Sequence, residues 1–306
     1  MGLRSILVLV SVFWKEKIMK KLLGWFVAAL FLLGMVTLTI PHLLLNVIWS
    51  GLRCENESAY RKRLSNWVLN WVLRYLSMVK KIMRLQIDLN IQKHIREADL
   101  HIGKAPRPNP IIIANHRTVI DHPIVALVAM KYYGINDIRW VLKSQMRRAP
   151  VVGWLMEQME CAFVSRSRDS SDIDHIHRMI DIARIDEASV MIYPEGTRFN
   201  GIPKPGSPYM HVRDPKHKGF GEICANMGTR DVLVILIDWD IPPLTGKTMW
   251  DGNAFVGRRV KVHAFPIRHP GYTNAKQCLH GVWQQADNLF ATNRRAKIDS
   301  LKDASK

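Results

Sequence analysis

The residues with the clearest chemical potential are a histidine and an aspartate that follow an apolar, β-branched run. The run 111–114 has the composition of a buried strand, and Asn115, His116 and Asp121 come after it. A histidine can take up a proton near neutral pH, and a neighbouring carboxylate fixes its tautomer and stabilises the imidazolium that forms. This arrangement predicts that His116 is a general base and that Asp121 orients it.

The spacing of this pair is not specific by itself. His94 and Asp99 have the same separation, but they lie in a polar stretch of helical character, which we interpret as a solvated surface. His116 differs because it ends an apolar strand and precedes His122 and Pro123, where a new element must begin. The context, more than the spacing, indicates a catalytic pair.

A second group of polar residues closes another apolar strand, 189–193. The residues that follow it are Pro194, Glu195, Gly196, Thr197 and Arg198. Glycine permits a tight turn, and the planar guanidinium of arginine matches the oxygens of a phosphate. The alternative is an ordinary turn with a structural ion pair between Glu195 and Arg198.

Together, the two segments resemble the glycerolipid acyltransferases, specifically the 1-acyl-glycerol-3-phosphate acyltransferases. The family's first block, an Asn-His pair followed by an Asp at fixed spacing, matches Asn115, His116 and Asp121. Its third block matches 194–198 residue for residue. The two blocks stand in the family's order, and the resemblance covers roughly residues 85–270.

The family's other two blocks match less closely. An aromatic residue shortly before an arginine looks like Phe163 and Arg166. An apolar strand that closes on a proline looks like 232–237, but other residues separate this run from Pro242. The departure puts the wall of the acyl pocket in doubt and leaves the chemistry unaffected.

The resemblance implies acyl transfer from a thioester, either acyl-coenzyme A or acyl-acyl carrier protein, to the hydroxyl of lysophosphatidate. His116 would take the proton of that hydroxyl, so the mechanism needs no acylated enzyme residue, no cofactor and no metal. In agreement, the sequence contains no Gly-x-Ser-x-Gly motif. The product, phosphatidate, feeds phospholipid synthesis.

The resemblance also implies an acceptor site in which arginines hold the phosphate. A lysine before a glycine at a helix start resembles a further family segment, and a helix N-terminus suits an anion. Lys216 and Lys218 both fit, with a solvated basic loop as the alternative. The implied substrate-binding residues are Asn115, Phe163, Arg166, Glu195, Gly196, Thr197, Arg198, Lys216 and Lys218.

The composition adds a strong positive charge. The 306 residues include 44 basic and 26 acidic ones, for a net charge of +18. Such a surplus favours an anionic partner, either nucleic acid or an anionic membrane. The sequence has no zinc-finger, helix–turn–helix or RNA-binding aromatic motif, which favours lipid over nucleic acid. Its four scattered cysteines predict neither a disulfide framework nor a metal site.

The N-terminal part contains an uncharged run, 22–52, that is long enough to cross a membrane. Positive residues flank both ends, so the run is either one tilted span or, broken at Pro41, a re-entrant pair. We interpret residues 1–18 as an upstream extension, with Met19 as the natural start. We expect a protein of the bacterial inner membrane whose active site faces the cytoplasm.

The segment 60–85 is predicted to be an amphipathic helix, because apolar residues recur on one helical face among basic residues. Its Trp and Tyr residues suit the headgroup layer of a membrane, and the alternative is packing against the domain. We therefore divide the chain into a membrane-associated helical region, 1–85, and a catalytic domain, 86–306.

The remainder alternates between strands and helices, which predicts an α/β fold with a mostly parallel or mixed sheet flanked by helices. The expected strands are 110–114, 138–142, 161–164, 189–193, 232–237 and 259–265. The expected helices are 122–131, 148–158, 171–186, 219–227 and 278–290. The polar segment 198–218 is expected to form a mobile loop beside the site.

Two other functions are compatible with this sequence. One is acylation of another lysophospholipid or of lysocardiolipin, because the segment 140–145 looks most like a bacterial subgroup close to eukaryotic lysocardiolipin-type enzymes. The other is a non-catalytic, membrane-anchored lipid-binding protein. The intact pair of His116 and Asp121 argues against the second, because a scaffold has no need for it.

Overall fold

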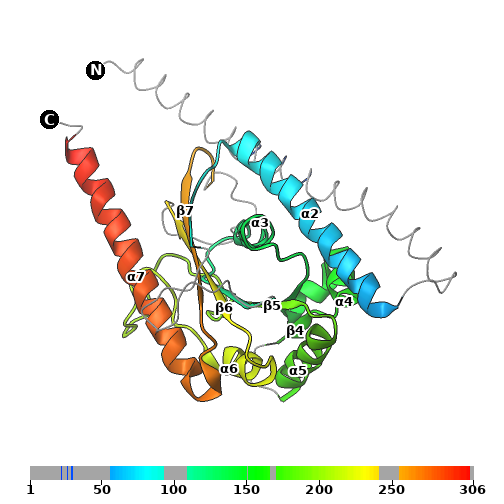
Figure 1. The fold of residues 1–306 in the computed structure, drawn as a ribbon. Coiled ribbons are helices and arrows are strands. Elements are labelled where there is room, and N and C mark those ends of the chain that lie inside the picture. Colours follow the sequence, from blue (N-terminus) through cyan, green and yellow to red (C-terminus); the bar gives the residue numbers. More distant parts are fainter. Residues whose placement is uncertain are drawn as a thin grey trace.

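A seven-stranded sheet forms the centre of the protein, with helices on both faces (Figure 1). The computed structural model describes residues 56–92, 109–149, 151–165, 170–240 and 255–303, together with Leu22, Phe26 and Ala29. The strands are β1 (Gln86–Ile91), β2 (Ile111–Ala114), β3 (Ile138–Lys143), β4 (Ala162–Val164), β5 (Ser189–Ile192), β6 (Val232–Trp239) and β7 (Arg259–Ile267). The helices are α2 (Glu57–Met83), α3 (Asp121–Tyr133), η2 (Ser144–Arg148), α4 (Val152–Gln158), α5 (Ser170–Ile185), α6 (His217–Asn226) and α7 (Gly271–Asp303).

The strands are arranged in the order β1-β7-β6-β2-β5-β3-β4. Every neighbouring pair is parallel except β6 and β7, which are antiparallel, so the sheet is mixed. The central strands β2, β5 and β6 are buried along their whole length, as expected for apolar strands covered on both faces.

Alternate residues of the central strands contribute to two separate hydrophobic cores. Ile112 and Ala114 of β2 pack with α2 and α3 on one face of the sheet. Ile111 and Ile113 of the same strand pack with α5, α6 and α7 on the other face. Figure 1 shows α2 and α3 on one side of the sheet and α6 and α7 on the other.

The six expected strands are present, and β1 is an additional strand at the edge of the sheet. Polar and apolar residues alternate along Gln86–Ile91, and its exposure alternates in the same way. Among the helices, α7 extends beyond the expected 278–290 at both ends. The expected helix 148–158 starts later, at Val152, because the 3-10 helix η2 occupies the preceding residues.

Helix α2 corresponds to the predicted amphipathic helix 60–85. Asn56 caps its N-terminus, because the side-chain Oδ1 accepts the backbone N–H of Ala59 at 2.8 Å. The apolar face, including Leu64 and Val68, is buried in the core that also contains α3. This face of α2 therefore packs against the domain.

The predicted N-terminal anchor lies almost entirely outside the described residues, as do the extension 1–18 and the pair His94 and Asp99. Within the ranges that the structure does describe, no helix combines the length and the apolar character needed to cross a membrane.

The segment expected to be a mobile loop, 198–218, packs against the second core and α7. Tyr209 and Val212 are buried in that core. The carboxylate of Asp287 in α7 accepts hydrogen bonds from the backbone N–H groups of Met210 and His211, at 2.9 and 2.5 Å. This packing holds the segment beside the edge of the sheet where β5 ends.

Candidate active site

The two sequence blocks meet at one edge of the sheet, because β2 and β5 are adjacent parallel strands. His116 follows the end of β2, and the turn from Glu195 to Arg198 follows the end of β5. In open α/β sheets, ligands and catalytic groups collect at the carboxyl ends of such strands. The topology thus brings together residues that are distant in sequence.

His116 and Asp121 form a hydrogen-bonded pair, with Nδ1 of the imidazole 2.9 Å from Oδ2 of the carboxylate. Asp121 is the first residue of α3 and is fully buried. An ionised carboxylate can only accept hydrogen bonds, so Nδ1 of His116 donates and Nε2 carries the lone pair. The pair is therefore arranged for His116 to accept a proton at Nε2.

Four further donors surround the carboxylate of Asp121. Oδ2 accepts the backbone N–H groups of Arg117 and Thr118 at 2.6 and 2.7 Å. Oδ1 accepts the hydroxyl of Thr118 at 2.9 Å and the indole N–H of Trp239 at 2.7 Å. Burial by itself raises the pKa of Asp121, but the hydrogen bond from His116 and the other donors bring that pKa below its usual value. Asp121 is therefore ionised at neutral pH.

Trp239 is a site residue that the sequence did not single out. It ends β6 beyond the expected end of the strand, within the block that resembles the family least. Ile235, Ile237 and Trp239 alternate along β6 and face the same core as α3. Because residues two apart on a strand share a face, extending the strand by two residues places Trp239 beside Asp121.

The turn that follows β5 holds the main chain of His116 on both sides. The N–H of His116 donates to Oε2 of Glu195 at 3.1 Å, and its carbonyl accepts the N–H of Phe199 at 2.7 Å. Glu195 is fully buried, and its Oε1 accepts the backbone N–H of Arg213 and the indole N–H of Trp283, at 3.2 and 3.3 Å. Burial raises the pKa of Glu195 to about 8.

Asn115 attaches the same stretch of main chain to β6, the strand on the other side of β2. Its side-chain amide donates to the carbonyl of Ile237 at 3.0 Å and accepts the N–H of Ile237 at 2.7 Å. Asn115 and Glu195 were both expected to bind substrate, but the hydrogen bonds of their side chains go to protein groups. Neither residue lines the cavity onto which His116 opens. The structure places both behind His116, where they fix its position.

That cavity has a volume of about 1500 Å³. Its wall is mainly apolar and comes from α2, α3, β3, η2 and α4. Representative lining residues are Trp71, Val72, Val79, Leu142, Leu155 and Met156. A cavity of this size and lining suits a long apolar ligand.

The same cavity has a basic rim. Gly196, Thr197 and Arg198 line it from the turn after β5, and Lys216 and Lys218 line it from the start of α6. Gly196 has a φ of +68°, a conformation that favours glycine, and the side chain of Lys216 passes 3.5 Å from the position a Cβ would take there. Arg198 and both lysines are exposed, so they can meet an anion. Five of the expected substrate-binding residues are thus brought together.

Residues 88–237, which contain both blocks, match the family model described as acyltransferase. This match, over about half of the chain, places the protein in the acyltransferase family that the model describes.

The names of curated relatives of this chain refer to several lysolipids. Lysocardiolipin acyltransferase 1 of Mus musculus is 24% identical over 213 residues, which cover 64% of this chain and 49% of the relative. Lyso-ornithine lipid O-acyltransferase of Pseudomonas aeruginosa is 25% identical over 174 residues, which cover 56% of this chain and 55% of the relative. The chain therefore spans about half the length of these relatives.

A solved structure has the same fold. The crystal structure of the 1-acyl-sn-glycerophosphate acyltransferase from Thermotoga maritima superposes with a TM-score of 0.56 at 16% sequence identity. The superposition covers 90% of this chain and 96% of that protein. The likeness supports the mixed α/β architecture described above.

Aromatic rings surround the imidazole of His116. The ring of Tyr193 stacks on His116 with centroids 4.2 Å apart, and His122 meets His116 edge-on at 5.2 Å. Trp140 lies 5.6 Å from His122 on the far side. Burial, followed by the charge of His116, lowers the pKa of His122 to about 3, so His122 is neutral near pH 7. The sequence predicted that a new element begins near His122, but it did not predict that the ring of His122 lies beside His116.

Phe163 lies apart from this cavity, although it was expected to bind substrate. It is buried in β4 and lines a second, smaller pocket, where the guanidinium of Arg147 lies 5.0 Å from its ring centroid. The next residue, Val164, lines the cavity beside His116. Arg166, the other residue of that block, lies outside the described residues.

The three cysteines that the structure describes are all unpaired thiols. Burial raises the pKa of Cys161 and Cys278 to about 11 and that of Cys224 to about 12, so none is an activated nucleophile. Among the described residues, no group of His, Cys, Asp or Glu is arranged to hold a metal ion.

Proposed function

We propose that this protein transfers a fatty acyl group from a thioester donor to the sn-2 hydroxyl of lysophosphatidate, which gives phosphatidate. The position of His116, on a cavity with an apolar wall and a basic rim, is the observation that supports this function best. The apolar wall suits the acyl chain, and the guanidinium and ammonium groups of the rim suit the phosphate.

In the proposed reaction, Nε2 of His116 takes the proton of the acceptor hydroxyl while the hydroxyl oxygen attacks the thioester carbonyl. A C–O bond forms, and the C–S bond breaks as the tetrahedral intermediate collapses. The thiolate leaves and takes up the proton from His116. The ionised Asp121 stabilises the imidazolium in between, so no enzyme residue is acylated and no cofactor takes part.

The acceptor phosphate is proposed to bind at the basic rim. Arg198 offers a planar fork to two phosphate oxygens, and Lys216 and Lys218 add positive charge from the start of α6. Thr197 and Gly196 complete the rim with a hydroxyl and a compact turn. Arg166 joins this site on the family resemblance alone.

The donor is proposed to be acyl-coenzyme A or acyl-acyl carrier protein, and the acceptor is supplied by a membrane. The uncharged run 22–52 would anchor the protein in the bacterial inner membrane, with the active site on the cytoplasmic side. The net charge of +18 favours attachment to anionic phospholipids. We keep the division into a membrane-associated region, 1–85, and a catalytic domain, 86–306, as part of this proposal.

A second candidate acceptor is lysocardiolipin or another lysophospholipid. The name of one relative, lysocardiolipin acyltransferase 1, favours this alternative. Either acceptor uses the same base and the same acyl cavity, because the reacting group is again a glycerol hydroxyl.

The test uses membranes that carry the wild-type protein or the His116→Ala variant, with labelled acyl-coenzyme A and, separately, labelled acyl-acyl carrier protein. The acceptors are lysophosphatidate, glycerol 3-phosphate, lysophosphatidylglycerol and lysocardiolipin. Phosphatidate formed by the wild type and lost in the variant would support the proposal, and another acylated product would change the acceptor. His94→Ala is the matched control, because His94 has the same spacing to an aspartate. No product with either type of donor would favour the non-catalytic lipid-binding alternative.

A further inference from the structure

Helix α2 forms one wall of the cavity beside His116. Trp67, Trp71, Val72, Tyr75 and Val79 of this helix line the cavity. The helix spans 27 residues, which is roughly 40 Å at the usual rise per residue. The shape of the apolar cavity therefore depends on where a single long helix lies.

The C-terminal end of α2 is fixed by the main chain. The carbonyl of Met83 accepts the N–H of Gly257 at 2.8 Å, and the chain continues directly into β1. β1 pairs in register with β7 from Gln86 to Ile91. This end of the wall is thus part of the sheet.

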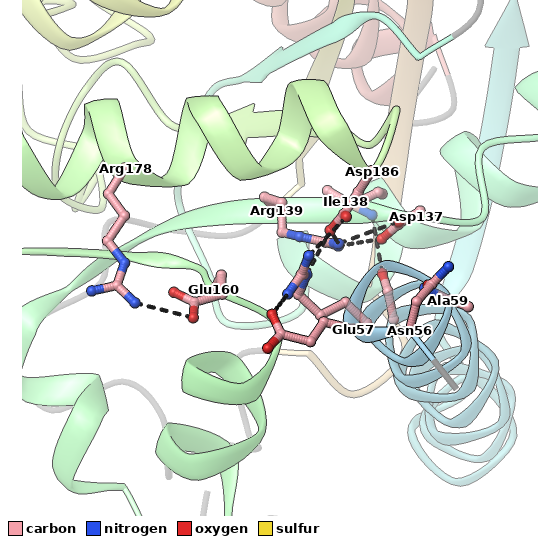
Figure 2. A network of polar contacts seen from close by, with 11 residues as sticks. Asn56, Glu57, Ala59, Asp137, Ile138, Arg139, Glu160, Arg178 and Asp186 are labelled. Carbon is pink, nitrogen blue, oxygen red and sulfur yellow. Dashed lines mark hydrogen bonds and ion pairs between the residues drawn. The ribbon is translucent and has the colours of Figure 1, made fainter. Parts of the chain in front are cut away.

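The N-terminal end of α2 is fixed in a different way, by a buried cluster of charges. Arg61 grips Asp186 with two parallel hydrogen bonds, Nε to Oδ2 at 2.7 Å and NH2 to Oδ1 at 2.9 Å. The side chain of Asp186 is fully buried, and its Oδ2 also accepts NH2 of Arg139 at 2.6 Å. Arg139, itself fully buried, pairs in turn with Asp137. Figure 2 shows Asp137, Arg139 and Asp186 gathered beside the first turn of α2.

A neutral hydrogen bond adds to the attachment. The hydroxyl of Ser65, one helical turn after Arg61, accepts the backbone N–H of Ile138 at 3.0 Å. Ile138 starts β3, and β3 carries Trp140 and Leu142, which line the same cavity. The cluster therefore joins two walls of the cavity, α2 and β3, at one point.

We propose that the ionic cluster of Arg61, Asp186, Arg139 and Asp137 sets the position of α2 and thereby the length of acyl chain that the cavity accepts. A buried ion pair contributes little net stability compared with apolar packing, but it admits few alternative geometries. Apolar contacts between α2 and α3 permit small shifts of one helix along another, whereas the fork of Arg61 on Asp186 does not. The inference rests on the proposed acyltransferase function and adds positioning residues for its chain-length specificity.

The main test compares acyl-coenzyme A donors of increasing chain length with the double variant Arg61→Met, Asp186→Asn. This variant removes one charge of each sign, so Arg139 and Asp137 remain a balanced pair and no buried charge is left alone. Arg61→Lys is the second variant, because it keeps the positive charge but cannot form the two parallel hydrogen bonds to Asp186.

We expect the ratio of kcat/KM between neighbouring donors to change at least threefold, because one buried methylene is worth about a fourfold factor in binding. Turnover with the saturated preferred donor should stay within about twofold of the wild type, because α2 supplies no group to the chemistry. A merely structural weakening would instead lower activity equally for all donors.

The matched control is the double variant Glu160→Gln, Arg178→Met. Arg178 and Glu160 also form an ion pair, at 3.2 Å, but the side chain of Arg178 is 71% exposed. Figure 2 shows this pair away from α2. If the wild type is active and both Arg61 variants keep its preference for donor chain length, the inference is wrong but the proposed function still stands. A wild type inactive with every donor would instead remove the proposed function on which the inference rests.

Discussion

The backbone N–H of His116 donates a hydrogen bond to Oε2 of the buried carboxyl group of Glu195 at 3.1 Å. This contact joins the two sequence blocks through a side chain that substrate does not reach, since Glu195 is fully buried. A second hydrogen bond joins the same two segments, because the backbone N–H of Phe199 donates to the carbonyl of His116. The turn after β5 thus has two structural roles: one side holds the main chain of His116, and the other side presents Arg198 to the cavity.

Replacing Asp121 by Asn is expected to lower kcat about 10²- to 10⁴-fold with little change in KM. An amide cannot stabilise the imidazolium of His116, and its N–H₂ group favours the wrong tautomer of the ring. Steady-state kinetics with acyl-coenzyme A and lysophosphatidate measure the effect, and a thermal melt checks that the variant is folded. Asp99→Asn serves as the control, since Asp99 has the same spacing to a histidine. Near-normal turnover in Asp121→Asn would remove Asp121 from the mechanism.

Trp239→Phe tests the residue that the family pattern did not reveal. The change removes the indole N–H from Oδ1 of Asp121, a hydrogen bond of 2.7 Å. With one donor fewer, the carboxylate attracts protonated His116 more strongly, so the acid limb of the pH profile of kcat/KM should move to higher pH. Turnover should fall about three- to tenfold, which corresponds to the roughly 0.6 to 1.4 kcal/mol of one ordinary hydrogen bond. Trp154→Phe, outside the cavity lining, should leave the profile in place.

The sequence predicted those parts of the site that depend on local patterns. The apolar runs 111–114 and 189–192 are strands in the structure, and both blocks follow them directly. Because these strands are parallel neighbours, two local predictions sufficed to bring His116 and Arg198 to the same edge. The strand β1 escaped detection because its alternation of polar and apolar residues is short and follows a long helix without a turn signal.

Other features depend on which face of an element a residue occupies, and no local pattern determines that. Phe163 and Val164 are adjacent in β4, so they point to opposite faces, and only Val164 reaches the cavity. A motif match could not decide between the two. The role of α2 as a cavity wall likewise depends on long-range packing, because Arg61 and Asp186 are 125 residues apart.

The basic rim can be tested by its effect on the acceptor alone. Arg198→Lys retains the charge but loses the planar fork, and Lys216→Ala removes a charge from the start of α6. Each change should raise KM for lysophosphatidate about five- to tenfold and leave KM for the acyl donor within about twofold. Arg295→Ala, at an exposed position of α7, is the control. Equal effects on donor and acceptor would argue that the rim does not bind the acceptor phosphate.

Glu195→Gln tests the buried carboxyl through the pH dependence of stability. The pKa of Glu195 is about 8 in the folded protein against 4.5 for the ordinary group, because burial disfavours the charged form. Between these values the folded state binds more protons than the unfolded state, so the contribution of Glu195 is complete below about pH 4.5 and is lost as the pH rises through 8. Thermal melts of both proteins across this range should show wild-type stability falling relative to the variant, by at most about 1.4 kcal/mol per pH unit. Other groups, such as His122, contribute equally to both proteins and cancel in the difference. A constant difference in melting temperature would mean that Glu195 stays ionised in the fold and holds the N–H of His116 as a carboxylate throughout.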